Sequence, residues 1–174
     1  MGSDTGVAKS PVKVKKIGHV VFRSSNIEAS TRFWTEVMGF KVSDRNETGM
    51  VFFRTASDHH TIGLAPAKAS PNGRTQDSPG FDHCAMEVGS VGELFKIRDH
   101  LKNHAVKIVF EGRRGPGCNV GVEFLDPDGN MIELYASMDQ IGWEGESRPR
   151  EQWCRATTLE DAVANPVAGA QYEV

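Results

Sequence analysis

The hexapeptide IGHVVF at residues 17–22 is echoed by FDHCAM at residues 81–86, and the interpretation of the whole chain starts from this repeat. Each run is short and rich in β-forming residues, and each has a histidine at its third position, His19 in the first and His83 in the second. Self-similarity at a fixed spacing is the signature of a fold built from repeated units. The sequence therefore predicts two copies of one module.

A helix is expected to follow each of these two strands. Ser25 with Glu28, and Ser90 with Glu93, have the spacing of a capping box, in which a hydroxyl caps the helix start and a glutamate reaches back. Gly39 is expected to end the first helix, because glycine accepts the left-handed conformation that follows a last helical turn. Apolar residues at helical spacing give each helix one stripe that faces the core.

Three further strands are predicted after each helix, so that each half has the order βαβββ. The turn DPDGN at residues 126–130 makes the last two strands antiparallel neighbours, since proline presets φ and glycine accepts a positive φ. The predicted strands after the helices are residues 40–43, 50–55, 61–65, 106–111, 120–125 and 131–136.

These elements predict an α+β fold in which two βαβββ modules pair into one curved mixed sheet that encloses a metal site. The domain covers residues 15–137, with modules at residues 15–67 and 80–137 joined by a polar linker. Residues 1–14 are expected to form a flexible arm. Residues 138–174 are expected to form a tail that packs on the domain or on a partner subunit.

Two imidazoles and one carboxylate are expected to converge on a divalent metal. His19 and His83 hold the same position in their modules, so pairing of the modules brings them together, and Glu133 follows in the last strand of the second module. The matching position in the first module is Gly63, which offers no ligand. Two histidines and one carboxylate with open positions are typical of non-haem Fe(II) sites, with Mn(II) and Zn(II) as alternatives.

Composition excludes several classes of function. A net charge of -3 without an extended basic stripe argues against nucleic-acid binding, which depends on clustered Lys and Arg. Apolar runs are far shorter than the roughly 20 residues that span a bilayer. We expect a cytoplasmic protein that binds a small-molecule substrate and forms a homodimer. The three cysteines are odd in number and widely spaced, which favours reduced thiols.

Residues 15–137 resemble the vicinal oxygen chelate superfamily, and within it the type I extradiol ring-cleavage dioxygenases. The segment DHHTI at residues 58–62 is similar to the one that carries their acid/base histidine, and GRRGPG at residues 112–117 resembles their GRHGPG loop. Two positions depart from the pattern. Arg114 stands where the family loop usually has a histidine, and Glu123 falls near the position of an active-site tyrosine.

The resemblance implies an Fe(II)-dependent extradiol-type dioxygenase that cleaves a catechol-like vicinal diol with O2 as co-substrate. His60 is the implied acid/base, whereas strand alternation favours its neighbour His59, which we keep as an alternative and as a substrate-binding candidate. Arg114 is predicted to bind an acidic group of the substrate.

Two other functions stay open. The first is a glyoxalase-type metal-dependent isomerase or lyase, against which the missing fourth ligand at Gly63 counts. The second is a small-molecule-binding protein of the resistance type with the same fold. The intact set of three ligands counts against this second function, because a sequestering pocket does not need a metal.

Overall fold

The structure is a computed structural model that describes residues 16–68, 81–143 and 145–174. The predicted N-terminal arm and most of the predicted linker lie outside these residues. The first module forms a four-stranded sheet in the order β1-β4-β3-β2, in which β1 and β4 are parallel and the other pairs are antiparallel. Its elements are β1 (Val20–Ser24), α1 (Ile27–Arg32) continued by the π-helix η1 (Phe33–Val37), β2 (Lys41–Arg45), β3 (Val51–Arg54) and β4 (Ile62–Pro66).

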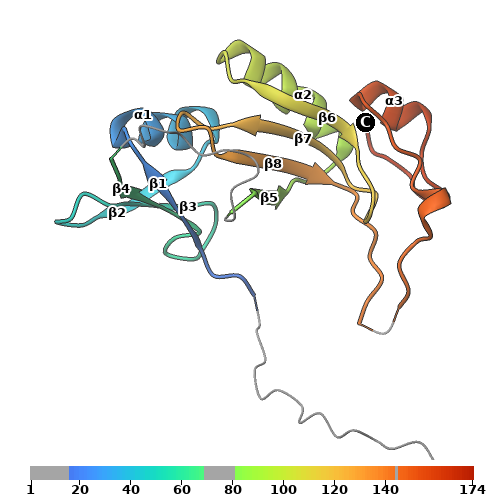
Figure 1. The fold of residues 1–174 in the computed structure, drawn as a ribbon, viewed down its shortest axis with the longest axis horizontal. Helices are drawn as coiled ribbons and strands as arrows, with labels where there is room; N and C mark the ends of the chain where they lie inside the picture. Colours follow the sequence, from blue (N-terminus) through green and yellow to red (C-terminus); the bar gives the residue numbers. More distant parts are fainter. Residues whose placement is uncertain (1–15, 69–80, 144) are drawn as a thin grey trace, which may run out of the picture.

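The second module repeats this arrangement in a second four-stranded sheet with the order β5-β8-β7-β6. Figure 1 shows the two modules side by side, with α2 lying over one face of the second sheet. The α+β class and the two βαβββ modules are thus confirmed, and the eight strands found in the described part of the chain are divided between two sheets. The elements are β5 (His83–Glu87), α2 (Val91–Asn103), β6 (Ile108–Arg113), β7 (Val120–Leu125) and β8 (Met131–Ala136).

Strand register shows that the two modules repeat residue by residue. In each sheet, the residue two places after the repeated histidine has its strand partner at one and the same position of the module, which is the position of Glu133 in the second module. Val21 pairs with Gly63 in the first sheet, and Ala85 pairs with Glu133 in the second. Gly63 therefore occupies in the first module the place that Glu133 has in the second.

The helix starts follow the sequence prediction in one module and differ from it in the other. Ser90 caps α2 by accepting a hydrogen bond from the backbone of Glu93, as predicted. The predicted cap at Ser25 is wrong, because Asn26 accepts the bond at the start of α1. The Ser25 side chain donates instead to Asp128 of the second module.

The two modules share one hydrophobic core. The apolar stripe of α1 and η1 fully buries Trp34 against its own sheet, and Phe33 reaches Phe124 on β7 with 6.4 Å between ring centroids. The continuous helix of α1 and η1 therefore packs on both sheets. Burial of side chains of this size, at about 1.5–3 kcal/mol each, makes the helix a major link between the modules.

A partly buried polar clamp adds to this contact. Asp128, in the turn between β7 and β8, accepts hydrogen bonds from the Ser25 backbone N at 2.8 Å and from Ser30 Oγ at 2.9 Å. Burial alone would raise the pKa of the Asp128 carboxyl, but the hydrogen bonds from Ser24, Ser25 and Ser30 together lower it below its ordinary value. The clamp is therefore strongest when Asp128 is ionised.

Replacing Asp128 by alanine should lower the free energy of unfolding by about 1–3 kcal/mol at pH 7, because it leaves the serine donors without their acceptor. A lowered pKa stabilises the fold above the ordinary aspartate pKa of about 4, and this stabilisation is lost as the pH falls through the folded pKa. Urea unfolding at pH 7 and near pH 3 tests both points, with the exposed Asp99→Ala as control. If Asp128→Ala lowered the free energy of unfolding equally at both pH values, the ionised Asp128 carboxylate would not be what stabilises the clamp.

The C-terminal segment packs on the edge of the second sheet. Arg113 at the end of β6 forms a β-bridge with Ala156, and the helix α3 (Leu159–Ala164) buries Leu159 and Ala162 completely. Figure 1 shows α3 beside β6, at the end of the molecule far from the first module. No helix among the described residues is long and apolar enough to cross a membrane.

Candidate metal centre

Two of the three predicted metal ligands lie together on the second module. His83 is the first residue of β5 and Glu133 lies in the neighbouring parallel strand β8, which brings His83 Nε2 to 3.4 Å from Glu133 Oε2. Side chains alternate along a strand, so both point away from the face that α2 covers. We call the surface formed by His83, Ala85, Glu123 and Glu133 the open face of the second module.

Neighbouring side chains orient this pair. His83 Nδ1 lies 2.6 Å from Asp82 Oδ2, so that in the tautomer with the hydrogen on Nδ1 it donates a hydrogen bond to this carboxylate and keeps Nε2 as a metal ligand beside Glu133. Asn119 Nδ2 donates to Glu133 Oε1 at 2.6 Å. Such contacts commonly hold metal-binding histidines and carboxylates in one orientation.

The surroundings of the Glu133 carboxylate favour the binding of a cation beside it. Burial raises the pKa of the Glu133 carboxyl and Glu123 adds to the rise, while His83, Asn119 and Arg114 act in the opposite direction. The net result is a pKa above the ordinary value. A divalent cation would compensate the desolvation that causes this rise.

Gly121 on β7 provides the space in which the Glu133 carboxylate lies. A Cβ at this position would lie 2.9 Å from Glu133 Oε1 and 3.2 Å from the Leu134 carbonyl oxygen. We expect Gly121→Ala to displace the carboxylate and to weaken metal binding by about 10-fold or more, as loss of a supporting contact does. The cost in stability should be small, because the carboxylate is the end of a flexible side chain.

Calorimetric titration of Gly121→Ala with Mn(II), compared with Gly129→Ala in an open turn, tests this prediction. A Cβ at Gly129 would meet nothing within 4 Å, although the positive φ there strains the turn. Equal metal affinity in Gly121→Ala and the wild-type protein would contradict the position assigned to the carboxylate.

Arg114 is held by a carboxylate of its own chain. Its Nη2 donates to Glu123 Oε2 at 2.9 Å and its Nε to Glu123 Oε1, and the guanidinium lies 3.8 Å above the Phe110 ring. Glu123 is buried and stands directly across from Glu133 in the strand pairing. The charge of Arg114 is therefore already balanced, and its predicted contact with an acidic substrate stays a prediction.

The remaining predicted site residues lie on the first module. His19, immediately before β1, has its ring 4.7 Å from the ring of His60, and His60 also contacts Phe52 at 5.0 Å. His59 Nδ1 lies 3.0 Å from His60 Nδ1. We call the corresponding surface of the first module its open face; it is formed by His19, Val21, Phe52 and His60. A Cβ at Gly63 would point to this side of β4, where it would meet the side chains of Val21 and Phe52.

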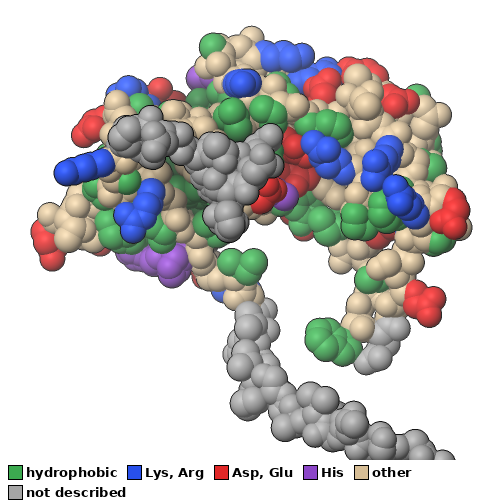
Figure 2. Space-filling view, viewed as in Figure 1, with side chains coloured by type: hydrophobic (Ala, Val, Ile, Leu, Met, Phe, Trp, Pro, Cys, Tyr) green, Lys and Arg blue, Asp and Glu red, His purple; other side chains and the backbone are tan. Residues whose placement is uncertain are grey.

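The structure thus divides the predicted ligand set into a pair and a single histidine. Among the described residues, no group of three His, Cys, Asp or Glu side chains is placed to hold one metal ion. Figure 2 shows histidine side chains on the underside of the first module, apart from acidic side chains near the middle of the view. The His83 and Glu133 donor set fits Fe(II), Mn(II) or Zn(II) in kind, but residues 16–68, 81–143 and 145–174 place no third ligand beside it.

Sequence reasoning missed two residues of this site. Asp82 directly precedes His83, and a carboxylate beside a candidate ligand is a usable signal in the sequence. Asn119 carries no local signal, because its role depends on the pairing of β7 with β8.

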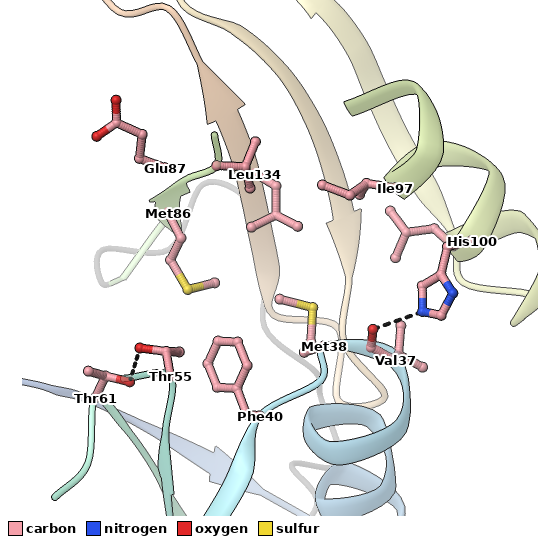
Figure 3. Close-up of a pocket in the computed structure, with 12 residues that line it drawn as sticks. Val37, Met38, Phe40, Thr55, Thr61, Met86, Glu87, Ile97, His100 and Leu134 are labelled. Atoms are coloured by element: carbon pink, nitrogen blue, oxygen red, sulfur yellow. Dashed lines mark hydrogen bonds between the residues drawn. The ribbon is translucent and has the colours of Figure 1, made fainter. Parts of the chain in front are cut away.

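A separate cavity of about 470 Å³ lies between the modules. Figure 3 shows Met38 and Phe40 of the first module facing Met86 and Leu134 of the second across this space. Leu134 and Met86 point to the face of the second sheet opposite to Glu133 and His83, because side chains alternate along a strand. The cavity is therefore distinct from the candidate metal centre, and most of its lining residues are apolar.

Comparison with known proteins agrees with this architecture. The sequence model of the Glyoxalase/Bleomycin resistance protein/Dioxygenase superfamily matches residues 16–134. Metapyrocatechase of Pseudomonas sp. (strain CF600) is 29% identical over 82% of this chain and 45% of its own length, so the chain spans about half of that relative. The metallothiol transferase FosB of Staphylococcus haemolyticus is 26% identical over 78% of this chain and 95% of its own.

A solved structure shows the same fold at low sequence identity. The glyoxylase/bleomycin resistance protein/dioxygenase domain from Frankia sp. EAN1pec superposes with a TM-score of 0.60 at 18% identity, covering 72% of this chain and 99% of that one.

Proposed function

Because the chain belongs to the Glyoxalase/Bleomycin resistance protein/Dioxygenase superfamily, we propose that it is a metal-dependent enzyme acting on a small molecule with two neighbouring oxygen atoms. The observation that carries the proposal is the pair of His83 and Glu133, which lie 3.4 Å apart on an open sheet face. Asp82 and Asn119 hold the pair in place, an arrangement that a merely structural histidine and glutamate do not need.

We propose more specifically an extradiol-type dioxygenase that uses Fe(II) and O2 to open a catechol-like ring. Support comes from the resemblance of residues 58–62 and 112–117 to such enzymes, and from the likeness to a metapyrocatechase. Glycine at position 63 adds support, since it offers no ligand at the place that Glu133 has in the second module and so leaves more of the metal open.

The chain's own residues then have distinct roles. A divalent metal at His83 and Glu133 would supply positive charge that stabilises two substrate oxygens as they lose protons. His60 would accept a proton at Nε2, because its Nδ1 is engaged with His59. Arg114 would bind an acidic substituent only by exchanging its present partner Glu123 for it.

A metal-dependent group transfer or isomerisation is the second candidate. The likeness to the metallothiol transferase FosB, which the chain spans almost completely, favours it. The two candidates differ in a measurable way, because only the dioxygenase consumes O2.

The test is oxygen uptake by protein purified without air and reconstituted with Fe(II), screened over catechols with and without an acidic group. Fe(II)-dependent uptake with the appearance of a ring-opened product is expected, and His60→Ala should reduce turnover by about 10²- to 10⁴-fold while retaining iron. The exposed His104→Ala serves as control. Metal binding without any oxygen uptake would favour the second candidate.

A further inference from the structure

The cavity of about 470 Å³ between the modules is lined mainly by apolar side chains that are only half-buried. Protein interiors contain few voids larger than a water molecule, and an apolar void of larger size stays dry and accepts apolar molecules. A cavity with this volume and these walls is typical of a small-molecule site. Its apolar walls include Val37, Met38, Phe40, Met86, Ile97 and Leu134.

The two walls of the cavity belong to different modules. Met86 and Leu134 are partners in the pairing of β5 with β8, and they lie on the face of the second sheet that α2 covers. Met38 and Phe40 face them from the junction between η1 and β2, as Figure 3 shows. Because the modules share one hydrophobic core, the fold itself sets the distance between these walls.

The described lining of the cavity offers no ion-pair partner to a ligand. Glu87 belongs to the lining, but Figure 3 shows its carboxylate directed away from Met86, and it lies on the same side of β5 as His83. His100 is exposed at the rim, where its Nε2 donates a hydrogen bond to the Val37 carbonyl oxygen at 2.9 Å. An ionised ligand would lose its hydration here without gaining a counter-ion. The walls therefore favour a neutral ligand.

One pair of hydroxyl groups gives the cavity a polar end. Thr55 Oγ1 lies 3.5 Å from Thr61 Oγ1, which is a long hydrogen bond, and both side chains belong to the lining. A threonine hydroxyl can donate to a ligand oxygen or accept from a ligand hydroxyl. Thr55 is exposed and Thr61 is half-buried, so Thr61 is the better partner for a ligand inside the cavity.

The walls and the volume favour an aromatic ligand of about two rings. Methionine side chains adapt to the shape of a ligand, and their sulfur atoms make favourable contacts with aromatic rings. Phe40 adds a ring against which another ring can pack. An apolar cavity of about 150 Å³ is enough for benzene, and the present cavity is roughly three times as large.

We propose that this cavity binds a neutral molecule of about two aromatic rings that carries a hydroxyl or carbonyl group. Its rings lie between Met38 and Met86, and its oxygen binds the Thr61 hydroxyl. The site is on the opposite face of β5 and β8 from His83 and Glu133. Binding should therefore require no divalent metal.

NMR of the isotope-labelled methionine methyl groups tests the position of the ligand in the wild-type protein. Titration with naphthol, without divalent metal, should shift the resonances of Met38 and Met86 together and saturate at one molecule per chain, because both methyl groups would contact the rings. Met138, which is exposed, and Met131, on the side of β8 that carries Glu133, are internal controls and should not shift. Met38→Leu and Met86→Leu assign the two resonances.

Two comparisons test the chemistry of the ligand. Naphthol should bind more tightly than naphthoate by about 10-fold or more, because burial leaves the carboxylate without a partner. Thr61→Val retains the shape of the side chain and removes the hydroxyl. It should weaken naphthol binding by about 3- to 10-fold and leave naphthalene binding unchanged.

A matched pair of variants tests the cavity itself. Val88 lines the cavity on the same side of the chain as Met86, so Val88→Trp should fill the space and abolish the shift of Met38. Val109→Trp makes the same change at an exposed position of β6 and should leave naphthol binding unchanged. Circular dichroism establishes that both variants are folded, and the titration of the wild-type protein needs neither of them.

Three results would overturn the proposed site. They are a wild-type protein in which saturating naphthol leaves Met38 and Met86 unshifted, equal affinity for naphthol and naphthoate, and undiminished binding by folded Val88→Trp. None of them affects the proposed metal dependence, which is measured separately by titration with Mn(II).

Discussion

Replacing Glu133 by alanine is expected to abolish tight binding of a divalent metal while leaving the protein folded. The carboxylate is a direct ligand in the proposed site, and loss of a mere supporting contact already costs about 10- to 100-fold in affinity, so the loss here should exceed about 100-fold. Stability should not fall, because the pKa of Glu133 is raised mainly by burial and its removal relieves that desolvation. Titration with Mn(II) and urea unfolding measure the two effects.

Two further variants test whether the loss of metal affinity is specific to Glu133. Glu87→Ala removes an exposed carboxylate from the neighbouring strand β5 and should leave affinity near that of the wild-type protein. Asp82→Asn retains both ligands but weakens the acceptor of His83 Nδ1, and should reduce affinity by about 10- to 100-fold. Wild-type affinity in Glu133→Ala would refute the site.

Replacing Arg113 by methionine is expected to release the C-terminal segment from the domain. Arg113 is 1% exposed, and its guanidinium donates to the backbone carbonyls of Cys154 at 2.5 Å, Asn165 at 2.8 Å and Ala162. Two of these carbonyls lie at the end of α3, where a positive charge is favoured by the helix dipole. The free energy of unfolding should fall by roughly 3 kcal/mol or more, since each buried carbonyl left unpaired costs about 1 kcal/mol or more.

Urea unfolding and limited proteolysis measure the loss, and the site of first cleavage should move into the segment after residue 154. Arg113→Lys should recover little, because an ammonium group cannot reproduce the planar set of donors. Arg32→Met on the exposed side of α1 is the control and should change stability by less than about 0.5 kcal/mol. An Arg113→Met protein as stable as the control would show that the segment is held by its apolar contacts alone.

Much of the module could be derived from the sequence because its signals are local. The strand pattern and the turn at residues 126–130 predicted β7 and β8 at their observed bounds, Val120–Leu125 and Met131–Ala136. Repetition of the histidine strand predicted that Gly63 and Glu133 are equivalent, and the register of the two sheets confirms this. Local patterns fail where a competing long-range contact exists, as at Ser25, whose hydroxyl binds Asp128 rather than capping a helix.

The sequence by itself determined the α+β class and the two βαβββ modules, because the alternation along each strand, the helix starts and the turns are short-range patterns. The proximity of His83 and Glu133 depends on the parallel pairing of β5 with β8. Only the tertiary structure decided how the modules meet. The continuous helix of α1 and η1 packs on both sheets through Phe33 and the Asp128 clamp, and this contact keeps His19 with His60 on a separate open face. The choice depends on shape and burial between residues about 100 positions apart, which no periodicity records.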